Sequence, residues 1–393
     1  MVAMGSSKEQ VKRNLLIDAL RGLCFVLMTA DHLPTNVLHR FSNTVYGPFG
    51  FFTAASGFVF LSGLVAGVVY GRDEQIYSTR AMTHRVGRRF RVIYLTHIAL
   101  YCIILVMVVL RMPGSSTWHL SLFSEHPWKA LWLGVSLLHE PNFLAILPMY
   151  CFFLALMPLL LSALRMGNVR WVLSGSVVLW VVSGLAIRFP VDPQGFCFGG
   201  FNPLSYQLLF IFGLAFGAGY VPIDRLSPAT ERMLVVLSIF IAGCFFLLRL
   251  AYVISSPVVS LAEQYQQWFS VIQLGPLRVL SFAAFGVVLY WFARTRGWCD
   301  CSNLLFRCLA FLGQHSLPVF SWSILTSYSA LSALPDHPNR LLRSLALLLA
   351  VTSLMLPAFL HAKLLQHLKK TRVVKSIEGD LVQLSGGVAG GRP

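Results

Sequence analysis

Charged side chains are scarce in this 393-residue sequence, and acidic ones are the scarcest. Aspartate and glutamate together number 15 against 31 lysines and arginines, and all four types make up only 12% of the chain. Soluble domains carry about 25% charged residues, so this shortage excludes an ordinary soluble protein. The chain is 56% hydrophobic with a mean hydropathy of +0.70, which indicates an integral membrane protein.

External cysteine pairs are also missing. Of the eight cysteines, most fall in apolar segments and only Cys197 falls in an expected outer loop, which excludes an intramolecular external disulfide. The stretch "CDCSNLLFRC", with Cys299, Cys301 and Cys308, has poor spacing for a thiolate metal cluster and no fourth ligand nearby. We therefore expect reduced structural thiols and no metal site.

Long apolar runs, in contrast, are abundant. A helix needs about 20 apolar residues to cross a hydrocarbon core of about 30 Å, and about ten runs approach this length. They lie near residues 15–33, 48–70, 92–110, 142–164, 171–187, 204–220, 233–254, 276–293, 308–331 and 341–362. The run at 128–138 is too short to span and is predicted to be interfacial or re-entrant. The expected fold is all-α, a polytopic membrane protein with about ten transmembrane helices.

The net charge of +16 falls on one side of this predicted topology. With a cytoplasmic N-terminus, the "KEQVKR" stretch, the Arg-rich segment at 72–91 and the basic C-terminal tail all lie inside, as the positive-inside rule requires. Both termini are therefore expected in the cytoplasm, and the basic excess does not indicate nucleic-acid binding. Residues 1–14 form an N-terminal tail, 15–362 the transmembrane domain, and 363–393 a basic, then Gly-rich tail that we expect to be disordered.

A secretory signal peptide is the alternative interpretation of the first apolar run. "KRN" resembles a basic n-region, "GLCFVLMTA" an apolar h-region, and residues 28–30 a small-residue cleavage site. Asp18 and Arg21 interrupt the approach to this apolar stretch, and the later runs need a further span to place the basic tail inside. We therefore expect the segment to be retained as a true span.

Four ionisable groups lie in this first span: Asp18, Arg21, Asp31 and His32. At about 100° per residue, Arg21 and His32 share one face of the helix and lie about 16 Å apart along its axis. Asp18 precedes Arg21 by one turn and is close enough to pair with it, which lowers the cost of a guanidinium in the bilayer. This face is predicted to line a polar cavity, unless Arg21 snorkels inward and His32 merely lies at the outer interface.

Several stretches resemble a known class of membrane acyltransferases. The spacing of Arg21 and His32 on a first span is similar to that of the acyltransferase-3 superfamily. Three further segments are similar to it: "FGFFTAASGFVFLSGLVAG" (49–67), "RVGRRFRVIY" (85–94) as an inner loop, and "FLGQHSLPVFSW" (311–322). Within that superfamily, "ILPMYCFFLALMP" (146–158) and "FNPLSYQLLFIFGLAFG" (201–217) resemble the OpgC family, whose members place succinyl groups on osmoregulated periplasmic glucans.

The resemblance implies a multi-pass O-acyltransferase of the bacterial inner membrane. It would move an acyl group, succinyl in the OpgC family, from a cytoplasmic acyl-CoA donor to a hydroxyl of a periplasmic glucan or other saccharide. No tightly bound cofactor is implied, because acyl-CoA (succinyl-CoA) is a substrate. The implied partners are membrane lipid, the donor, the saccharide acceptor and proteins of glucan synthesis.

The sequence departs from the family pattern at four positions. Members often carry acidic residues where this chain has Thr53, Ser56 and Ala145, and many superfamily members have a second histidine near the position of Ser323. A different acceptor would follow if those groups bind the acceptor or tune the base.

Acyl transfer from a thioester to a hydroxyl requires a base, hydrogen-bond donors for the tetrahedral oxyanion and a binding site for the acyl carrier. His32 suits the base, and its neighbour Asp31 could hold a tautomer if the helix bends there. Arg21 suits the oxyanion or the carrier diphosphate, because its planar fork binds phosphate. The inner-face donor site is assigned to three arginines of one segment, Arg88, Arg89 and Arg91. The alternative is that they only enforce topology.

The outer side should contain the acceptor. The aromatic, Gly-rich stretch at 188–203 includes Asn202, an amide suited to sugar hydroxyls, although interfacial aromatic belts have a similar composition. A dicarboxylic acyl group keeps one free carboxylate, for which Arg249 and Arg278 offer cations near the outer ends of their spans. Snorkelling toward the interface is the alternative explanation of both arginines.

Two further patterns and one further class of function leave alternatives open. Small residues, including Gly63 and Gly67, favour close helix packing over a cavity.

His315 and Pro318 predict a kink in the ninth span. There the histidine either lines the cavity or forms a hydrogen bond with a carbonyl that the kink leaves free. A transporter or flippase would use the ionisable groups of the first span as a proton or substrate path, but the runs lack the matched broken helices of secondary transporters.

Overall fold

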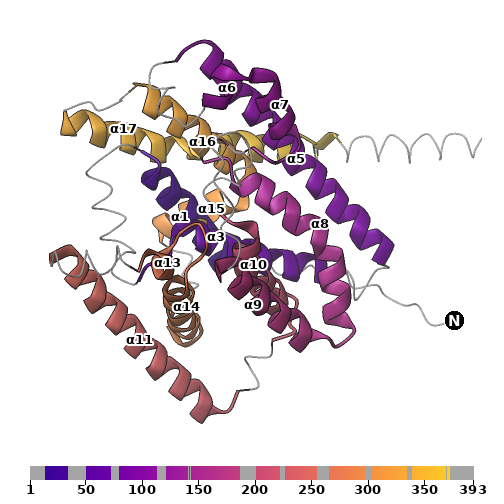
Figure 1. Ribbon diagram of the computed structural model, residues 1–393, viewed down its shortest axis with the longest axis vertical. Coiled ribbons are helices and arrows are strands. Elements are labelled where there is room, and N and C mark those ends of the chain that lie inside the picture. The colour runs from indigo at the N-terminus through magenta and orange to yellow at the C-terminus, as the bar shows by residue number, and fades with distance from the viewer. Residues whose placement is uncertain are drawn as a thin grey trace, which may run out of the picture.

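The computed structural model describes residues 14–33, 50–71, 79–112, 121–139, 141, 143–185, 201–221, 226–254, 265–296, 303–333, 339–368 and 370–371. The secondary-structure elements of these residues are helices, as the sequence predicted (Figure 1). They are α1 (Leu15–Asp31), α3 (Ala54–Ala66), the π-helix η2 (Gly67–Gly71), α5 (Thr79–Val109), α6 (Ser121–Glu125), α7 (Pro127–Val135), α8 (Ile146–Arg165), α9 (Val169–Leu185), α10 (Pro203–Gly217), α11 (Pro228–Ile254), α13 (Gln266–Phe269), α14 (Pro276–Arg296), α15 (Leu304–Gln314), α16 (Ser316–Ala333) and α17 (Arg340–Ser353).

Six helices of the described residues are long and apolar enough to cross a membrane, or seven if α15 and α16 form one bent span. The six are Ala54–Gly71, Thr79–Val109, Ile146–Arg165, Pro228–Leu248, Pro276–Thr295 and Leu341–Leu368. The other predicted runs also contain helix, but α1, α9 and α10 have only 17, 17 and 15 residues. The chain is therefore a helical membrane protein, whereas ten spans and two cytoplasmic termini stay predictions.

The arginine-rich stretch predicted as an inner loop is helical instead. α5 continues unbroken for 31 residues, which at 1.5 Å per residue is about 46 Å and exceeds the roughly 30 Å of a hydrocarbon core. Its first turns therefore extend beyond the core on the predicted cytoplasmic side. Arg88, Arg89 and Arg91 consequently point in different directions around one helix.

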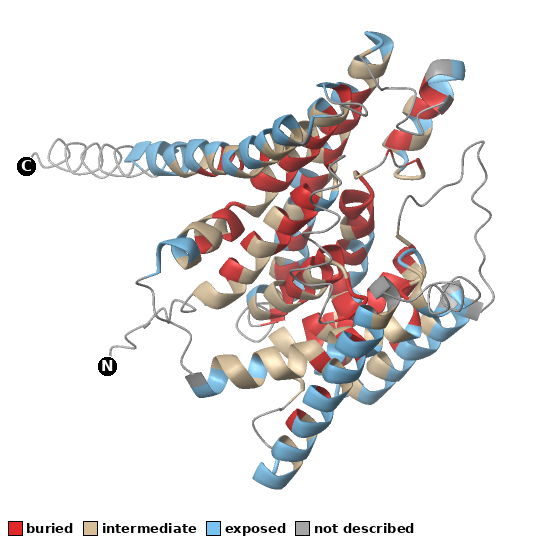
Figure 2. Ribbon diagram, turned by 90° about the vertical axis from the view of Figure 1, so that its left-hand side faces the viewer, coloured by how far each residue is buried: buried red, intermediate tan, exposed pale blue. Residues whose placement is uncertain are grey.

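Buried residues gather toward the middle of the molecule, and the long peripheral helices are exposed (Figure 2). The exposed side chains of α11 are mostly apolar, including Phe240 and Leu247. In a bilayer these side chains face lipid, so their exposure is compatible with a membrane-spanning helix. α7 also exposes two tryptophans, Trp128 and Trp132, and at nine residues it is too short to span, which agrees with the predicted interfacial helix.

Polar side chains fix where five helices begin. Asn14, Asn202, Asn303 and Asn339 each accept hydrogen bonds from backbone N–H groups in the first turn of the helix that follows. Thr53 caps α3 by accepting from the N–H of Ser56. These caps satisfy N–H groups that have no partner within the helix, a need that is strongest in an apolar solvent.

Glycines set the closest helix contacts. A Cβ on Gly63 of α3 or on Gly67 of η2 would overlap backbone atoms of α10, and a Cβ on Gly213 or Gly217 of α10 would overlap backbone atoms of α3. The predicted packing role of the small residues in α3 is therefore confirmed. α1 and α15 cross in the same way, because Gly22 lies against the carbonyl of Leu309 and Gly313 against the carbonyl of Asp18.

Hydrogen bonds hold α7 against α5. The Tyr101 hydroxyl donates to the carbonyl of Ala130 and lies 2.9 Å from Nδ1 of His139. Because that hydroxyl has one proton, His139 donates in the second contact. Burial lowers the pKa of His139 to about 4, so the ring is neutral near pH 7. A further hydrogen bond between the two helices joins Nε2 of His97 and the carbonyl oxygen of Gly134, which lie 3.1 Å apart.

The contact between α3 and α10 can be tested with paired glycine variants. We expect Gly213→Ala to lower the free energy of unfolding by about 1–3 kcal/mol, because the added methyl group would overlap the backbone at Phe60. Gly175→Ala is the matched control, since a Cβ there meets open space, and it should be neutral or slightly stabilising. Thermal unfolding of the purified protein, followed by circular dichroism, measures both, and equal midpoints would argue against a backbone contact at Gly213.

Candidate functional site

α1 presents Arg21 to a small cavity of about 20 Å³. Its polar lining comes from five side chains, each on a different helix: Arg21 of α1, Ser62 of α3, Arg89 of α5, Tyr150 of α8 and Ser316 of α16. A cavity of this size accommodates about one water molecule. A cavity is thus present at Arg21, with Arg89 of α5 also in its lining, but apolar side chains such as Phe58, Leu147 and Phe320 form much of that lining and His32 is not part of it.

Arg21 packs against an aromatic ring of α3. Its guanidinium carbon lies 5.8 Å from the centre of the Phe58 ring, within the range of a cation–π interaction. Asp18, one turn earlier on α1, is buried with 5% of its surface exposed, and its carbonyl lies against Gly313 of α15. The ion pair predicted between Asp18 and Arg21 stays a prediction.

The structure separates the three arginines predicted to bind the donor. Arg89 is half-buried and lines the cavity, whereas Arg88 and Arg91 are exposed. The separation follows from the helical geometry of α5, since consecutive side chains on a helix point about 100° apart. Only Arg89 of the three therefore shares the cavity with Arg21.

His32 lies at the other end of α1, as its C-cap. Its ring centre is 4.1 Å from that of Phe143, and Phe143 in turn packs edge-on against buried Tyr328 of α16. His32 Nδ1 is buried and has no hydrogen-bond partner among the described residues. Asp31, the predicted partner of His32, is exposed and does not bond this nitrogen.

Arg21 and His32 belong to one seam between α1, α8 and α16. Near Arg21 the cavity is lined by Leu147 of α8 and Phe320 of α16, whereas His32 contacts Phe143, just before α8, and Phe143 in turn packs against Tyr328 of α16. The two ionisable groups therefore both lie toward α16 and the start of α8, in agreement with the shared face predicted from their spacing on α1.

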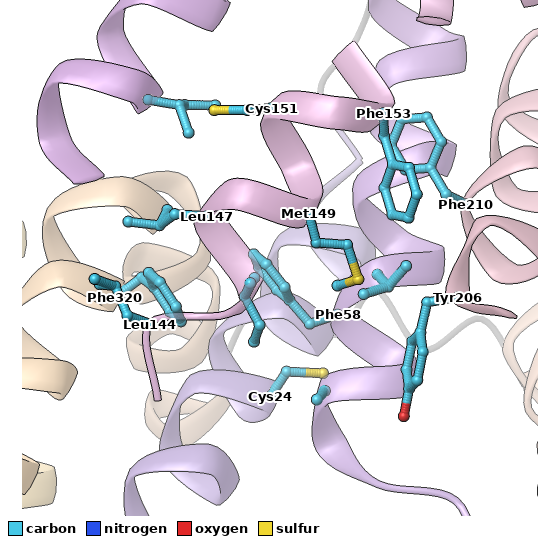
Figure 3. Packing of buried hydrophobic residues seen from close by; sticks show 14 of the residues in the cluster. Cys24, Phe58, Leu144, Leu147, Met149, Cys151, Phe153, Tyr206, Phe210 and Phe320 are labelled. Atoms are coloured by element: carbon cyan, nitrogen blue, oxygen red, sulfur yellow. The ribbon is translucent and has the colours of Figure 1, made fainter. Parts of the chain in front are cut away.

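Aromatic side chains fill the seam between its two ends. Phe25 lies on α1 between Arg21 and His32 and has its ring centre 5.1 Å from that of Phe58. Phe58 and Phe320 stack with nearly parallel rings 6.2 Å apart. Figure 3 shows Phe58 and Phe320 among the apolar side chains of α1, α3, α8 and α10. The seam is thus apolar in the middle and polar at each end.

The predicted kink of the ninth span is present and sharp. α15 and α16 meet at His315 with a bend of 94°, so residues 308–331 do not form one straight helix. Pro318 has no N–H to donate to the preceding turn, and the hydroxyl of Ser316 donates to the carbonyl of Gly313 at 2.8 Å. Ser316 lines the cavity, whereas Nδ1 of His315 lies 2.8 Å from Nδ1 of His361.

The predicted acceptor residues on the outer side have structural contacts. The Asn202 side chain caps α10, and its backbone N–H donates to the carbonyl of Ile272 at 2.8 Å. Arg278 donates to the carbonyls of Phe269 and Phe51, which ties two connecting segments together. Residues 188–200 and the Arg249 side chain lie outside the described part of the chain.

The residues at the positions that depart from the family pattern are buried or make local hydrogen bonds. Thr53 and Ser56 lie 3.1 Å apart through their hydroxyl oxygens at the start of α3, and Ser323 donates to the carbonyl of Phe320 within α16. Ala145 is buried. Each position therefore has a packing role, and its influence on the acceptor stays a prediction.

Sequence reasoning missed part of the cavity. Nothing in the sequence marks Tyr150 or Ser62 as lining the same cavity as Arg21, because their place in it depends on how α3 and α8 pack. Ser316 has a weak signal, since it precedes Pro318 in a stretch that was expected to kink. Among the described residues, no three histidine, cysteine, aspartate or glutamate side chains gather as a metal site would require.

Comparison with known proteins identifies the family. A family model described as OpgC protein matches residues 13–366, which include the cavity and His32. No curated protein and no solved structure matches the chain. The match covers nearly the whole chain and indicates a bacterial acyltransferase that modifies glucans. The chain belongs to the OpgC protein family.

Proposed function

We propose that the protein moves an acyl group from acyl-CoA on the cytoplasmic side to a saccharide hydroxyl on the outer side of the bacterial inner membrane. By the family resemblance the acyl group is succinyl and the acceptor a glucan. The observation that supports this most is the seam of α1, α8 and α16, with Arg21 and Arg89 at one end and His32 at the other. About 16 Å separate the two ends along α1, a span comparable to an extended pantetheine arm.

Arg21 and Arg89 suit the diphosphate of the donor. Planar guanidinium groups bind phosphate oxygens through paired hydrogen bonds, and these bonds are stronger where water is largely excluded. The hydroxyls of Ser62 and Ser316 line the same cavity and can donate to further oxygens. Since the cavity holds about one water, donor entry requires the Phe58 and Phe320 rings to separate.

His32 suits the proton transfers. Its unpartnered Nδ1 accepts the proton of the saccharide hydroxyl while the hydroxyl oxygen attacks the thioester carbonyl. The carbon–oxygen bond forms, the tetrahedral intermediate collapses and the carbon–sulfur bond breaks. His32 then returns its proton to the coenzyme A sulfur, so that the products are an ester and a free thiol and the histidine is neutral again.

The outer side is proposed to hold the acceptor and the free carboxylate of the acyl group. Arg278 is half-buried and remains a candidate cation for that carboxylate, with Arg249 as the second. Asn202 is the candidate for sugar hydroxyls near the start of α10. The proposal also includes membership of the acyltransferase-3 superfamily, partner proteins from glucan synthesis, and a multi-pass topology with cytoplasmic termini.

Acyl transfer by the purified protein tests the function directly. The protein in liposomes should convert succinyl-CoA and a glucan into succinylated glucan and free thiol, detected by mass spectrometry and a thiol reagent. Envelope glycans from a deletion strain should lose the same acyl mass. Movement of substrate across the liposome without an acylated product would support the transporter alternative and contradict the enzyme.

Neighbouring arginines on α5 allow a matched test of donor binding. We expect Arg89→Gln to raise KM for acyl-CoA by about 10- to 100-fold, because it removes charge-assisted hydrogen bonds to the donor. Arg88→Gln removes the same charge one residue away from an exposed position and should change KM by less than about threefold, as a screened surface charge. Steady-state kinetics of both variants measures the contrast, and equal effects would rule out a specific role for Arg89.

His32 is tested with a second histidine as its control. His32→Ala should fold and insert, leave donor KM nearly unchanged, and lower kcat by about 10²–10⁴-fold, the usual contribution of a general base. His126 is exposed and makes no side-chain cap at the start of α7, so His126→Ala should keep its kcat. Unchanged turnover in the His32 variant would remove it from the mechanism.

A further inference from the structure

His315 and His361 form a buried pair at the break between α15 and α16. Their Nδ1 atoms lie 2.8 Å apart, although 46 positions separate the two residues in the chain. His315 is 9% exposed, and His361, on the helical segment Leu341–Leu368, is half-buried. The proposed chemistry uses neither ring.

Neighbouring rings hold the pair in place. Phe311 packs edge-on against His315 with 4.9 Å between ring centres, and it also contacts Phe359, two residues before His361. The two histidine rings are nearly perpendicular, with centres 5.0 Å apart. Both imidazoles therefore sit in a defined orientation between α15 and the last long helix.

The hydrogen bond between the two histidines depends on how many protons the two rings hold. An Nδ1-to-Nδ1 hydrogen bond needs one ring to donate and the other to accept, so the two neutral rings must be opposite tautomers. One added proton leaves the bond intact, because the accepting nitrogen is still free of hydrogen. A second proton makes both Nδ1 atoms donors, and the bond is lost.

This bond is one residue away from the cavity lining. Ser316 follows His315 and lines the cavity beside Arg21 and Arg89, and Phe320, one turn further along α16, stacks on Phe58. Pro318 leaves the start of α16 with fewer hydrogen bonds to α15. The direction of α16 at the break therefore depends on contacts from outside the bent pair.

We propose that the His315–His361 hydrogen bond holds the bent helix pair against the last long helix, so that both histidines are positioning residues for donor binding. This inference rests on the proposed function of the cavity as the donor site. Charged groups on the elements around the break include Asp18 and Arg21 of α1, Arg89 of α5, Arg307 of α15, and Arg343 and the exposed Lys363 of the last long helix.

Binding of coenzyme A itself to the purified, folded protein tests the proposal. His361→Leu removes the bond at every pH and should weaken binding by about tenfold at pH 8, the equivalent of one hydrogen bond. In His361→Gln the amide can donate to a neutral His315 or accept from a protonated one, so the bond should persist at every pH. His367→Gln, at an exposed position two turns on, is the matched control.

The pH dependence of coenzyme A affinity distinguishes a positioning role of the histidine pair from a purely structural one. Between pH 8 and pH 5, wild type and His367→Gln should lose coenzyme A affinity more steeply than His361→Gln, because only they can break the bond by double protonation. In protein with ¹⁵N-labelled imidazoles, magic-angle-spinning NMR should show a nitrogen–nitrogen coupling across the hydrogen bond that is absent in His361→Leu.

The possible outcomes distinguish the positioning role of the histidine pair from the proposed function. Parallel pH profiles for His361→Gln and His367→Gln, with wild-type affinity in His361→Leu, would overturn the positioning role while leaving the donor site intact. Absence of coenzyme A binding in the wild type would overturn the proposed function instead. If His361→Leu does not fold, the contrast between the two glutamine variants still gives the answer.

Discussion

The close crossing of α1 and α15 is the contact on which the rest of the site depends. Gly22 and Gly313 let the two backbones touch, and a side chain at either position would push α1 away from the bent pair. Arg21 would then move away from Ser316 and Phe320, which line the same cavity. Because helices in a bilayer gain little from the hydrophobic effect between them, such close backbone contact is a main source of their association.

The bilayer also explains why the polar groups gather at two ends of one seam. A guanidinium costs several kcal/mol at the centre of a membrane, even on lenient scales. Arg21 is placed toward one end of α1, where Phe58 and the hydroxyls of the cavity surround it. Between Arg21 and His32 the seam is lined by Phe25, Phe58 and Phe320, which keep the part between the two polar ends apolar.

Local sequence patterns predicted the features that depend on one helix. The eleven-residue spacing on α1 determines which face holds Arg21 and His32, and Pro318 alone is enough to predict a bend. The wrong predictions concern how far helices extend. The segment at 85–91 was predicted as an inner loop from the distribution of basic residues and the family resemblance, yet arginine is a good helix former and α5 simply extends beyond the core.

Contacts between distant helices could not be predicted from the sequence. His315 has a partner 46 positions away, in a helix whose periodicity gives no sign of it. Arg89 differs from Arg88 and Arg91 only through the rotation of α5 about its axis, which packing against α8 and α16 determines. A single-sequence argument therefore identifies the kinds of group that an acyl transfer needs, while the arrangement of helices selects which arginine shares the cavity with Arg21.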